Sequence, residues 1–246
     1  MIKIGSWNLR NYSSKRNPLP VAEIIKNYDL IALIEIRGED CIKKLIELLP
    51  GYKYSISPPL CSTQTSAQQT GKRREHYAFI WSSKIEMIKY STVEAPCHFV
   101  RPPHIGFFKV NGGFDFIFAA IHVVWGKKID RVIEIENINI LIDKIVKSAS
   151  GEGDIILAGD FNMPPENFSL PPEWMPLING GTTVLKSGGE GSRYDNIWIN
   201  KNNTSEYAGK SEIIKSSGGS DHYPIIAYFN NFDDDEGIPN LNDIKL

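Results

Sequence analysis

Two short runs of apolar residues constrain the fold of this chain more than any other feature. Residues 30–36 are apolar except for Glu35, and residues 155–159 are apolar throughout. Both runs are far shorter than the ~18 residues that a membrane-spanning helix needs. Continuous runs of this length are typical of strands that are buried on both faces. The chain therefore predicts a sheet that other layers cover on both sides.

The rest of the pattern mixes strands and helices. Asn111-Gly112-Gly113 predicts a hairpin of residues 107–110 and 114–121. A second hairpin is expected at 77–81 and 85–90, turned by residues 82–84. Hydrophobic periodicity and helix-start signals place the other strands at 2–7, 30–36, 154–158, 196–200 and 225–229, the helices at 21–27, 40–49 and 130–147, and loops at 60–76 and 163–191. Because each half runs strand–helix–strand and then antiparallel strands, we expect two packed sheets flanked by helices.

Size and charge set the remaining bounds. A chain of 246 residues, 41% of them hydrophobic, can bury a core without disulfides or structural zinc. We expect one domain over residues 1–229 and an acidic tail over residues 230–246. The tail carries a net charge of −4 of the total −2, which leaves +2 on the body. This charge permits an anionic substrate but does not establish one.

Cysteine usage and the first residues bear on location. The three cysteines, Cys41, Cys61 and Cys97, form no C-x-x-C pair, which favours reduced thiols in a cytoplasm. Residues 1–5 show no apolar signal core. We expect a cytoplasmic protein, or a secreted one if a signal peptide has been removed from it. We also expect a monomer that does not bind membranes.

Polar residues stand where the apolar strands end. Such groups need a partner or a ligand at the rim of a core. Five of them offer oxygen atoms, and no zinc-type spacing of cysteine or histidine accompanies them, so the set favours a hard cation: Mg²⁺, or else Mn²⁺ or Ca²⁺. The five are Asn8, Glu35, Asp160, Asn162 and Asp221.

Two histidines, His122 and His222, also stand at strand ends. A carboxylate beside a histidine fixes its tautomer and raises its pKa, which prepares the ring for proton transfer. Each fragment alone has a plainer interpretation: G-D-F-N at 159–162 as a turn, and S-D-H-Y-P at 220–224 as a cap before a strand. Their joint occurrence at successive strand ends favours one catalytic site.

These motifs together resemble the endonuclease–exonuclease–phosphatase superfamily, and most closely the deoxyribonuclease I family. The superfamily motifs are W-N-L at 7–9, the glutamate of I-E-I-R at 34–37, G-D-F-N and S-D-H-Y-P. Residues 74–81 resemble the deoxyribonuclease I strand that supplies a carboxylate partner for a catalytic histidine, here Glu75 for His122. Residues 99–103 resemble its arginine-bearing segment, here Arg101. Abasic-site enzymes are not expected to have that glutamate–histidine pair.

The resemblance covers nearly all of residues 1–229 and implies a four-layered α/β sandwich of two mixed sheets flanked by helices. There are departures. The loop at 163–191 has no cysteine, whereas secreted members carry disulfides. Arg73 stands where the pancreatic enzyme has a tyrosine that stacks on deoxyribose, which puts that contact in doubt. Arg37 matches the family arginine that enters the minor groove.

The implied activity is metal-dependent hydrolysis of phosphodiester bonds in DNA, most readily duplex, with little sequence specificity and with 5′-phosphate and 3′-hydroxyl ends. Asn8, Glu35 and Asp221 would bind the ion. Asp160 and Asn162 would hold a second ion or orient the phosphate and the attacking water. His222, held by Asp195, would act on the nucleophile, and His122, held by Glu75, on the leaving oxygen, although the sequence does not assign acid and base. The expected DNA-binding residues are Arg10, Arg37, Arg73, Arg74 and Arg101.

Three alternatives stay open at this stage. The first is a phosphatase of inositol or sphingolipid phosphates with the same core; an adjacent tryptophan pair, expected of the lipid branch, is missing. The second is an abasic-site endonuclease, which is expected to have a bulky apolar residue before S-D-H where this chain has Ser217-Gly218-Gly219. The third is a catalytically silent binding module, against which the intact set of motifs argues.

Overall fold

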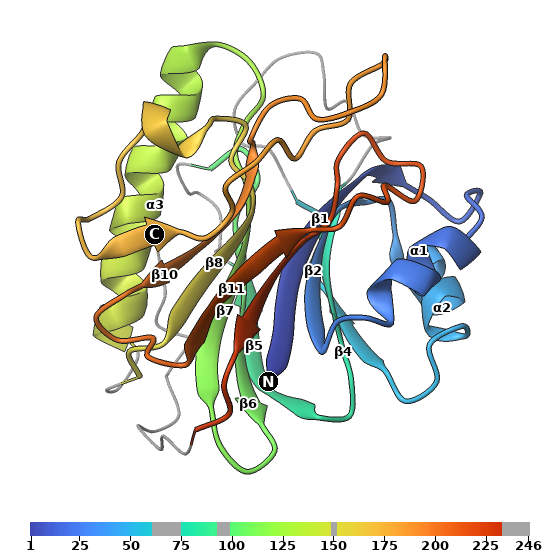
Figure 1. Ribbon diagram of the computed structural model, residues 1–246, viewed down its shortest axis with the longest axis horizontal. Helices are drawn as coiled ribbons and strands as arrows, with labels where there is room; N and C mark the ends of the chain where they lie inside the picture. The colour runs from blue at the N-terminus through green and yellow to red at the C-terminus, as the bar shows by residue number, and fades with distance from the viewer. Residues whose placement is uncertain (61–74, 93–98, 149–151, 233–246) are drawn as a thin grey trace.

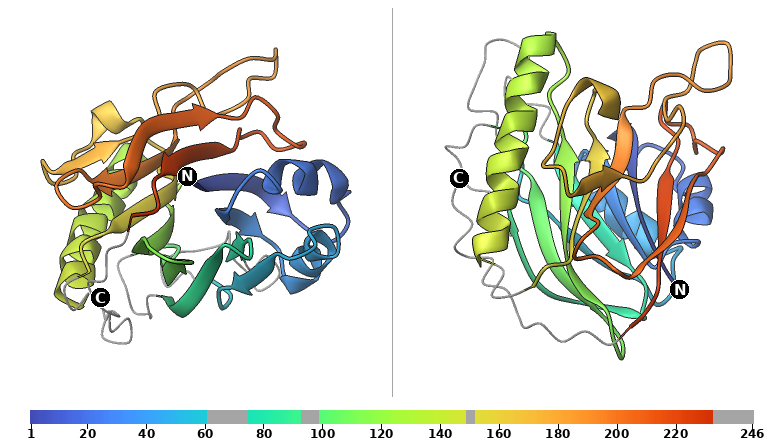
Figure 2. Two further views of the ribbon diagram at one scale, coloured as in Figure 1. Left: turned by 60° about the horizontal axis from the view of Figure 1, so that its bottom comes forward. Right: turned by 60° about the vertical axis from the view of Figure 1, so that its left-hand side comes forward.

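The computed structural model describes residues 1–60, 75–92, 99–148 and 152–232. Two six-stranded sheets lie face to face, with two short helices outside one sheet and a long helix outside the other (Figures 1 and 2). These four layers confirm the sandwich expected from the sequence. Cys41, the one cysteine within the described ranges, is a buried free thiol.

The first sheet holds both ends of the described chain. Its strands, in spatial order, are β11 (Tyr207–Ile213), β12 (Ile225–Phe229), β1 (Ile2–Tyr12), β2 (Leu30–Ile36), β4 (His76–Trp81) and β3 (Lys53–Ile56). Two helices, α1 (Leu19–Ile25) and α2 (Glu39–Ile46), pack their apolar residues on its outer face. On α2 the residues that face this layer, Cys41, Ile42 and Leu45, follow helical spacing.

The second sheet is built from the middle of the chain. Its order is β5 (Ile85–Thr92), β6 (His104–Val110), β7 (Asp115–His122), β8 (Ile155–Asp160), β10 (Asp195–Asn200) and β9 (Trp174–Pro176). Helix α3 (Lys128–Ser148) covers its outer face through Ile135, Ile138, Leu141, Ile142 and Ile145. A single 3₁₀ turn, η1 (Pro165–Asn167), follows β8. Among the described helices, none combines the length and apolarity needed to cross a bilayer.

Aromatic side chains fill the space between the sheets. Phe79 of β4 meets Phe108 of β6 edge to face, with ring centroids 5.4 Å apart, and lies 5.4 Å from Phe118 of β7. All three rings are fully buried. Such pairs add ~0.5–1.5 kcal/mol each beyond the burial of their area. These contacts therefore hold the two sheets against each other.

Each sheet contains one parallel pair of central strands, and this arrangement positions the site. β1 pairs with β2, with Asn8 opposite Ile34, and β7 pairs with β8, with His122 opposite Asp160. The carboxyl ends of a parallel pair lie at the same edge of the sheet. Both pairs end at the upper rim of the sandwich in Figure 1.

The predicted hairpin of residues 77–81 and 85–90 is wrong. β4 belongs to the first sheet, where it pairs with β2 and β3, and β5 belongs to the second, where it pairs with β6. The turn between them crosses from one sheet to the other. Asp29, just before β2, anchors this turn: its carbonyl accepts from the Ser82 N–H at 2.8 Å and its carboxylate meets Lys84 Nζ at 2.9 Å.

The hairpin of β6 and β7 forms as expected, and 30–36 and 225–229 are strands with the predicted bounds. β1 extends to Tyr12, beyond the expected residue 7, and β3, β9 and β11 were not expected as strands. The expected loop at 163–191 contains η1 and β9. Most of the expected loop at 60–76, and residues 233–246 of the expected tail, lie outside the described residues.

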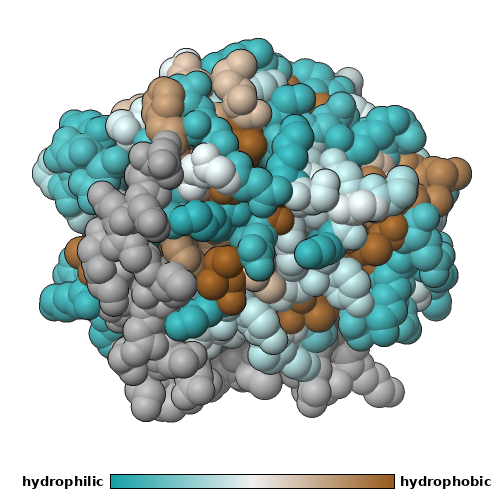
Figure 3. Space-filling view, turned by 90° about the horizontal axis from the view of Figure 1, so that it is seen from below, coloured by the Kyte–Doolittle hydropathy of each residue, from teal (hydrophilic) through white to brown (hydrophobic). Residues whose placement is uncertain are grey.

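Below the sheets, the surface seen in Figure 3 is mostly hydrophilic, with small separate hydrophobic groups on the described residues in view.

A buried carboxyl, Glu152, precedes β8 and is 2% exposed. Its Oε1 accepts from the Asp154 N–H at 2.6 Å. Burial, and next to it the carboxyls of Asp115 and Asp154, raise the pKa of Glu152 to about 9, against the opposing effect of that N–H.

Replacing Glu152 by Gln is expected to change how stability depends on pH. A carboxyl whose pKa is higher in the folded protein binds more protons when folded, so its contribution is fully present below about pH 4.5 and is lost as the pH rises toward 9. Gln keeps the acceptor and removes the titration. The variant should therefore gain on the wild type by up to about 1.4 kcal/mol per pH unit across this window. Urea denaturation of both proteins at pH 5, 7 and 9 measures this effect. The same change of unfolding free energy with pH in both proteins would contradict it.

Candidate active site

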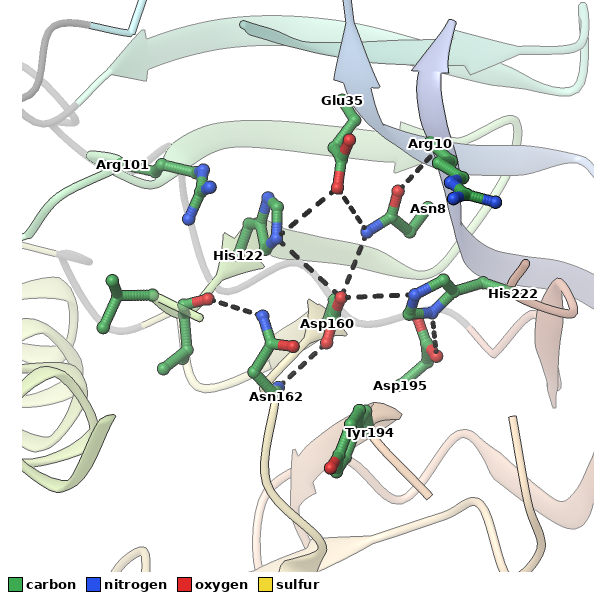
Figure 4. A network of polar contacts seen from close by, with 12 residues as sticks. Asn8, Arg10, Glu35, Arg101, His122, Asp160, Asn162, Tyr194, Asp195 and His222 are labelled. Atoms are coloured by element: carbon green, nitrogen blue, oxygen red, sulfur yellow. Dashed lines mark hydrogen bonds and ion pairs between the residues drawn. The ribbon is translucent and has the colours of Figure 1, made fainter. Parts of the chain in front are cut away.

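A polar cavity of about 310 Å³ opens at the rim where the two parallel pairs end. Its walls come from both sheets and from the loops between their strands. Figure 4 shows the side chains converging on Asp160 from both sides. The lining residues are Glu35, Arg101, His122, Trp125, Asp160, Asn162, Thr183, Val184, Tyr194, Asp221 and His222.

Asn8 links the two central carboxylates. Its Nδ2 donates to Glu35 Oε1 at 3.2 Å and to Asp160 Oδ2 at 3.0 Å. Its Oδ1 accepts from the Arg10 N–H at 2.9 Å, which fixes the orientation of the amide. In this orientation Asn8 holds the carboxylates together, and the oxygen that was expected to bind a metal faces the backbone.

Strained backbone presents these side chains. Glu35, Arg10 and Asn11 have φ values of 61°, 46° and 56°, and the pairing of β1 with β2 is irregular between Asn8 and Tyr12. A non-glycine residue in this region costs of order 1–3 kcal/mol. The Asn11 N–H donates to Glu35 Oε2 at 3.0 Å. The irregular segment between Asn8 and Tyr12 therefore supplies an N–H donor that holds the carboxylate of Glu35 toward the cavity.

The G-D-F-N motif uses each of its polar residues. Gly159 has φ 155°, and a Cβ there would come within 1.8 Å of the carbonyl oxygen of Ile121, so β7 and β8 can approach this closely only with glycine. Asp160 Oδ1 accepts from the Asn162 N–H at 2.8 Å. Asn162 Nδ2 in turn donates to the Val123 carbonyl at 2.8 Å. The motif thus fixes Asp160 and Asn162 at the end of β8.

His222 and Asp195 form the expected pair. His222 Nδ1 lies 2.7 Å from Asp195 Oδ2. The serine of S-D-H-Y-P, Ser220, donates its hydroxyl to the Asn8 carbonyl at 2.7 Å, which ties this loop to β1. Burial lowers the pKa of His222, but Asp195, and then Asp160 and Asp221, outweigh it and raise the pKa to about 10.

The second expected pair is looser. His122 Nδ1 lies 3.7 Å from Glu75 Oε2, beyond the hydrogen-bond distance that the sequence predicted. Glu75 instead accepts from Arg101 Nε at 2.7 Å. Burial, then the positive charges of Arg101 and His222, lower the pKa of His122 well below its usual value. Glu75 is therefore paired mainly with Arg101, and its contact with His122 is the longer of the two.

Both imidazoles face the same oxygen. His122 Nε2 and His222 Nε2 each lie 3.8 Å from Asp160 Oδ2, and His122 Nε2 is 4.0 Å from Glu35 Oε1. Burial, and next to it Asp195, raise the pKa of Asp160 to about 6. The site thus combines converging carboxylates with two rings that can donate or accept a proton.

This donor set fits a divalent cation. Glu35 and Asp160 approach one amide nitrogen from two sides, and Asp221 Oδ1 is buried without a hydrogen-bond partner. Ligand atoms of Asp160, Asp195 and His222 also lie within 4.8 Å of one another. Because His222 and Asp195 already bond each other, and because hard cations prefer oxygen, Glu35 and Asp160 are the stronger candidates.

The arginines expected to bind DNA divide into three groups. Arg101 lines the cavity, and its Nη1 is buried without a hydrogen-bond partner. Arg37 approaches Glu75 at 3.7 Å, whereas Arg10 is exposed and meets Asp221 at 3.2 Å. Arg73 and Arg74 lie outside the described residues.

Four cavity residues were not singled out in the sequence: Trp125, Thr183, Val184 and Tyr194. Two of them are aromatic. Trp125 follows His122 by three residues in the loop after β7, and Tyr194 precedes Asp195 at the start of β10. Each is an aromatic residue next to a motif residue, which was the available signal. Trp125 carries an exposed indole at the mouth of the cavity, 64% accessible to solvent.

A protein family and a relative both match the sequence of this chain. The sequence pattern of the Endonuclease/Exonuclease/phosphatase family matches residues 5–222. A "Deoxyribonuclease" of Thioalkalivibrio sp. (strain K90mix) is 27% identical over 219 residues, which are 82% of this chain. The match spans 59% of that relative's length.

Solved structures show the same fold. A mannosyl-6-phosphatase of Bacteroides thetaiotaomicron superposes with a TM-score of 0.69 at 20% identity, covering 92% of this chain and 98% of that one. TDP2 of D. rerio, solved with a single-strand DNA product, superposes with a TM-score of 0.67 at 14% identity, covering 94% and 99%. At these identities the likeness concerns the fold alone.

Proposed function

The chain belongs to the Endonuclease/Exonuclease/phosphatase family, and on this basis we propose that it is a divalent-metal-dependent endonuclease that hydrolyses phosphodiester bonds in DNA. The products would be 5′-phosphate and 3′-hydroxyl ends. The single observation that carries the proposal is the arrangement of His122 and His222, each 3.8 Å from Asp160 Oδ2. A phosphate bound at that point would have one proton-transferring ring on either side.

Hydrolysis of a phosphodiester needs charge compensation and two proton transfers. Glu35 and Asp160 would hold the cation, which offsets the charge that develops on the phosphoryl oxygens. Asp195 orients His222, and Asn162 is fixed at the floor of the cavity, where it can hold the attacking water or a phosphoryl oxygen. Arg101, buried and with a free Nη1, would contact the phosphate directly.

DNA is favoured as the substrate by the relative named as a deoxyribonuclease, although this chain spans less than two thirds of that protein. Duplex DNA is the form we propose first, and Arg10 and Arg37 at the rim would contact its backbone or minor groove. The competing function is hydrolysis of a phosphate monoester, as in the mannosyl-6-phosphatase with the same fold. A cavity of about 310 Å³ is large enough for a phosphodiester group of DNA and for a phosphate monoester.

Incubation with supercoiled plasmid separates these functions. With Mg²⁺ or Mn²⁺ we expect nicked and then linear plasmid, and with excess EDTA we expect intact plasmid, because the carboxylates alone leave the phosphoryl charge uncompensated. End-labelling would show whether the new 5′ ends carry phosphate. Parallel reactions contain mannose 6-phosphate, inositol phosphates or a sphingolipid phosphate. Release of phosphate from any of these, with plasmid left intact at low salt, would overturn the nuclease proposal.

A further inference from the structure

A second cavity lies beside the catalytic one. Its volume is about 440 Å³, and Tyr194 lines both cavities. Its walls come from the start of α3, the segment after β8 and the residues before β10. The lining residues are Lys128, Arg131, Met163, Pro164, Glu166, Asn167, Ser192, Arg193 and Tyr194.

The charge of this cavity is positive. Its lining carries three cationic side chains, Lys128, Arg131 and Arg193, and one carboxylate, Glu166, which pairs with Arg193. Arg131 Nη1 donates to the carbonyl of Asn162 at 2.6 Å, and its Nε is buried without a hydrogen-bond partner. Arg131 therefore contacts the backbone of the catalytic G-D-F-N motif while its guanidinium borders the second cavity. Excess positive charge within a short distance of the catalytic carboxylates favours an anion there.

Trp125 lines the catalytic cavity and contacts two residues that line the second one. Its ring lies 6.0 Å from that of Tyr194, and the Arg131 guanidinium lies 5.7 Å from its centroid. These neighbours hold the indole on one side, yet 64% of the residue stays accessible. A large aromatic that is held in place and left open at the rim of a polar cavity is suited to stack on a planar ligand.

We propose that Trp125 and the cavity of Lys128, Arg131 and Arg193 bind the nucleotide next to the scissile phosphate. The indole stacks on its base and the cations hold its flanking phosphate. This inference rests on the proposed nuclease function and specifies its substrate. Each base of a DNA strand is flanked by two phosphates, and here the indole lines the cavity proposed for the scissile phosphate and contacts Arg131 of the cationic cavity. A base that stacks on Trp125 has left its duplex neighbours, so this site takes an unpaired nucleotide, in single-stranded DNA or at a frayed end, in addition to the duplex substrate proposed above.

The test compares variants on three substrates. Trp125→Ala should raise the KM for a single-stranded oligonucleotide by about tenfold or more, the effect of losing one stacked base. Trp125→Phe, which keeps an aromatic face, should restore most of this loss. The ratio of kcat/KM for the oligonucleotide to that for bis(nitrophenyl) phosphate should fall by a similar factor, and the loss should be smaller on intact duplex.

Phe232 provides a matched control. It is an exposed aromatic, 53% accessible, next to the β6–β7 turn, which lies at the opposite end of β7 from His122. Phe232→Ala should leave all three activities as in the wild type. Replacing Lys128 by Ala should reduce the salt slope of oligonucleotide binding by ~1, as expected for one lost phosphate contact.

Binding without cleavage gives a second readout. The anisotropy of a fluorescein-labelled oligothymidylate is measured against protein concentration in EDTA; we expect binding by the wild type and much weaker binding by Trp125→Ala. If the wild type cleaves plasmid but Trp125→Ala matches it on single strands in KM and in binding, the stacking site is overturned and the nuclease function stands. If the wild type cleaves no DNA and binds no oligonucleotide, both proposals fail.

Discussion

Replacing Glu35 by Gln is expected to lower the rate of the proposed DNA cleavage by ~10²-fold or more, as with the loss of one preorganised electrostatic contact. Gln keeps the shape of the side chain and an oxygen for the Asn11 N–H, but it removes the charge that would hold the cation beside Asp160. The loss should be greatest at limiting Mg²⁺. Initial rates of plasmid nicking over a range of Mg²⁺ concentrations measure this effect.

Glu39→Gln is the matched control for this substitution. Glu39 is a surface carboxylate on α2 that pairs with Lys43 and Tyr54. The Glu39→Gln variant should nick plasmid at the wild-type rate. Near-normal nicking by Glu35→Gln at limiting Mg²⁺ would remove Glu35 from the metal site.

Asp195→Asn is expected to reduce cleavage by ~10²–10⁴-fold, the usual contribution of a positioned proton-transfer group. The amide keeps the volume of the carboxylate and an acceptor for His222 Nδ1, which lies 2.7 Å from Asp195 Oδ2, but it removes the negative charge that raises the pKa of this ring. Because the two residues act as a unit, the double variant Asp195→Asn/His222→Ala should be no slower than His222→Ala alone. Rates on plasmid and on bis(nitrophenyl) phosphate should fall together.

The thermal unfolding of each variant provides the check on structure. Thr182 Oγ1 accepts from the Asp195 N–H at 3.0 Å, and this contact does not depend on the carboxylate. A variant that melts near the wild type therefore reports chemistry and not unfolding. Multiplicative losses in the double variant would instead show that Asp195 and His222 act separately.

The sequence predicted the layers and the location of the site because both depend on local patterns. A strand buried on both faces reads as a continuous apolar run, and 30–36 is such a strand with the predicted bounds. The polar residues that interrupt or end these runs have few structural uses at the edge of a core. Asn8, Glu35, Asp160 and His122 accordingly meet at one rim.

What the sequence could not predict depends on contacts between distant segments. The turn at 82–84 looks like a hairpin turn, but contacts with distant segments lead β5 into the other sheet. Asp29, more than fifty residues earlier, and Asn111, just after β6, both bond to the turn. Glu75 was paired with His122 by resemblance, but Arg101 competes for the same carboxylate and holds it more closely. Trp125 has no motif of its own, so its place at the cavity follows from the fold.

The division of the site between two sheets has a consequence for its control. Asn8 and Glu35 lie on strands of one sheet, whereas His122 and Asp160 end strands of the other. Neither half is complete, so their catalytic distances depend on how the halves sit across the aromatic seam of Phe79 and Phe108. Misplacement by ~1 Å can cost ~10²-fold in rate. Residues of that seam touch no substrate, yet substitutions there can change the reaction rate as much as substitutions in the cavity. A ligand or mutation that shifts one sheet against the other would therefore lower the rate from a distance.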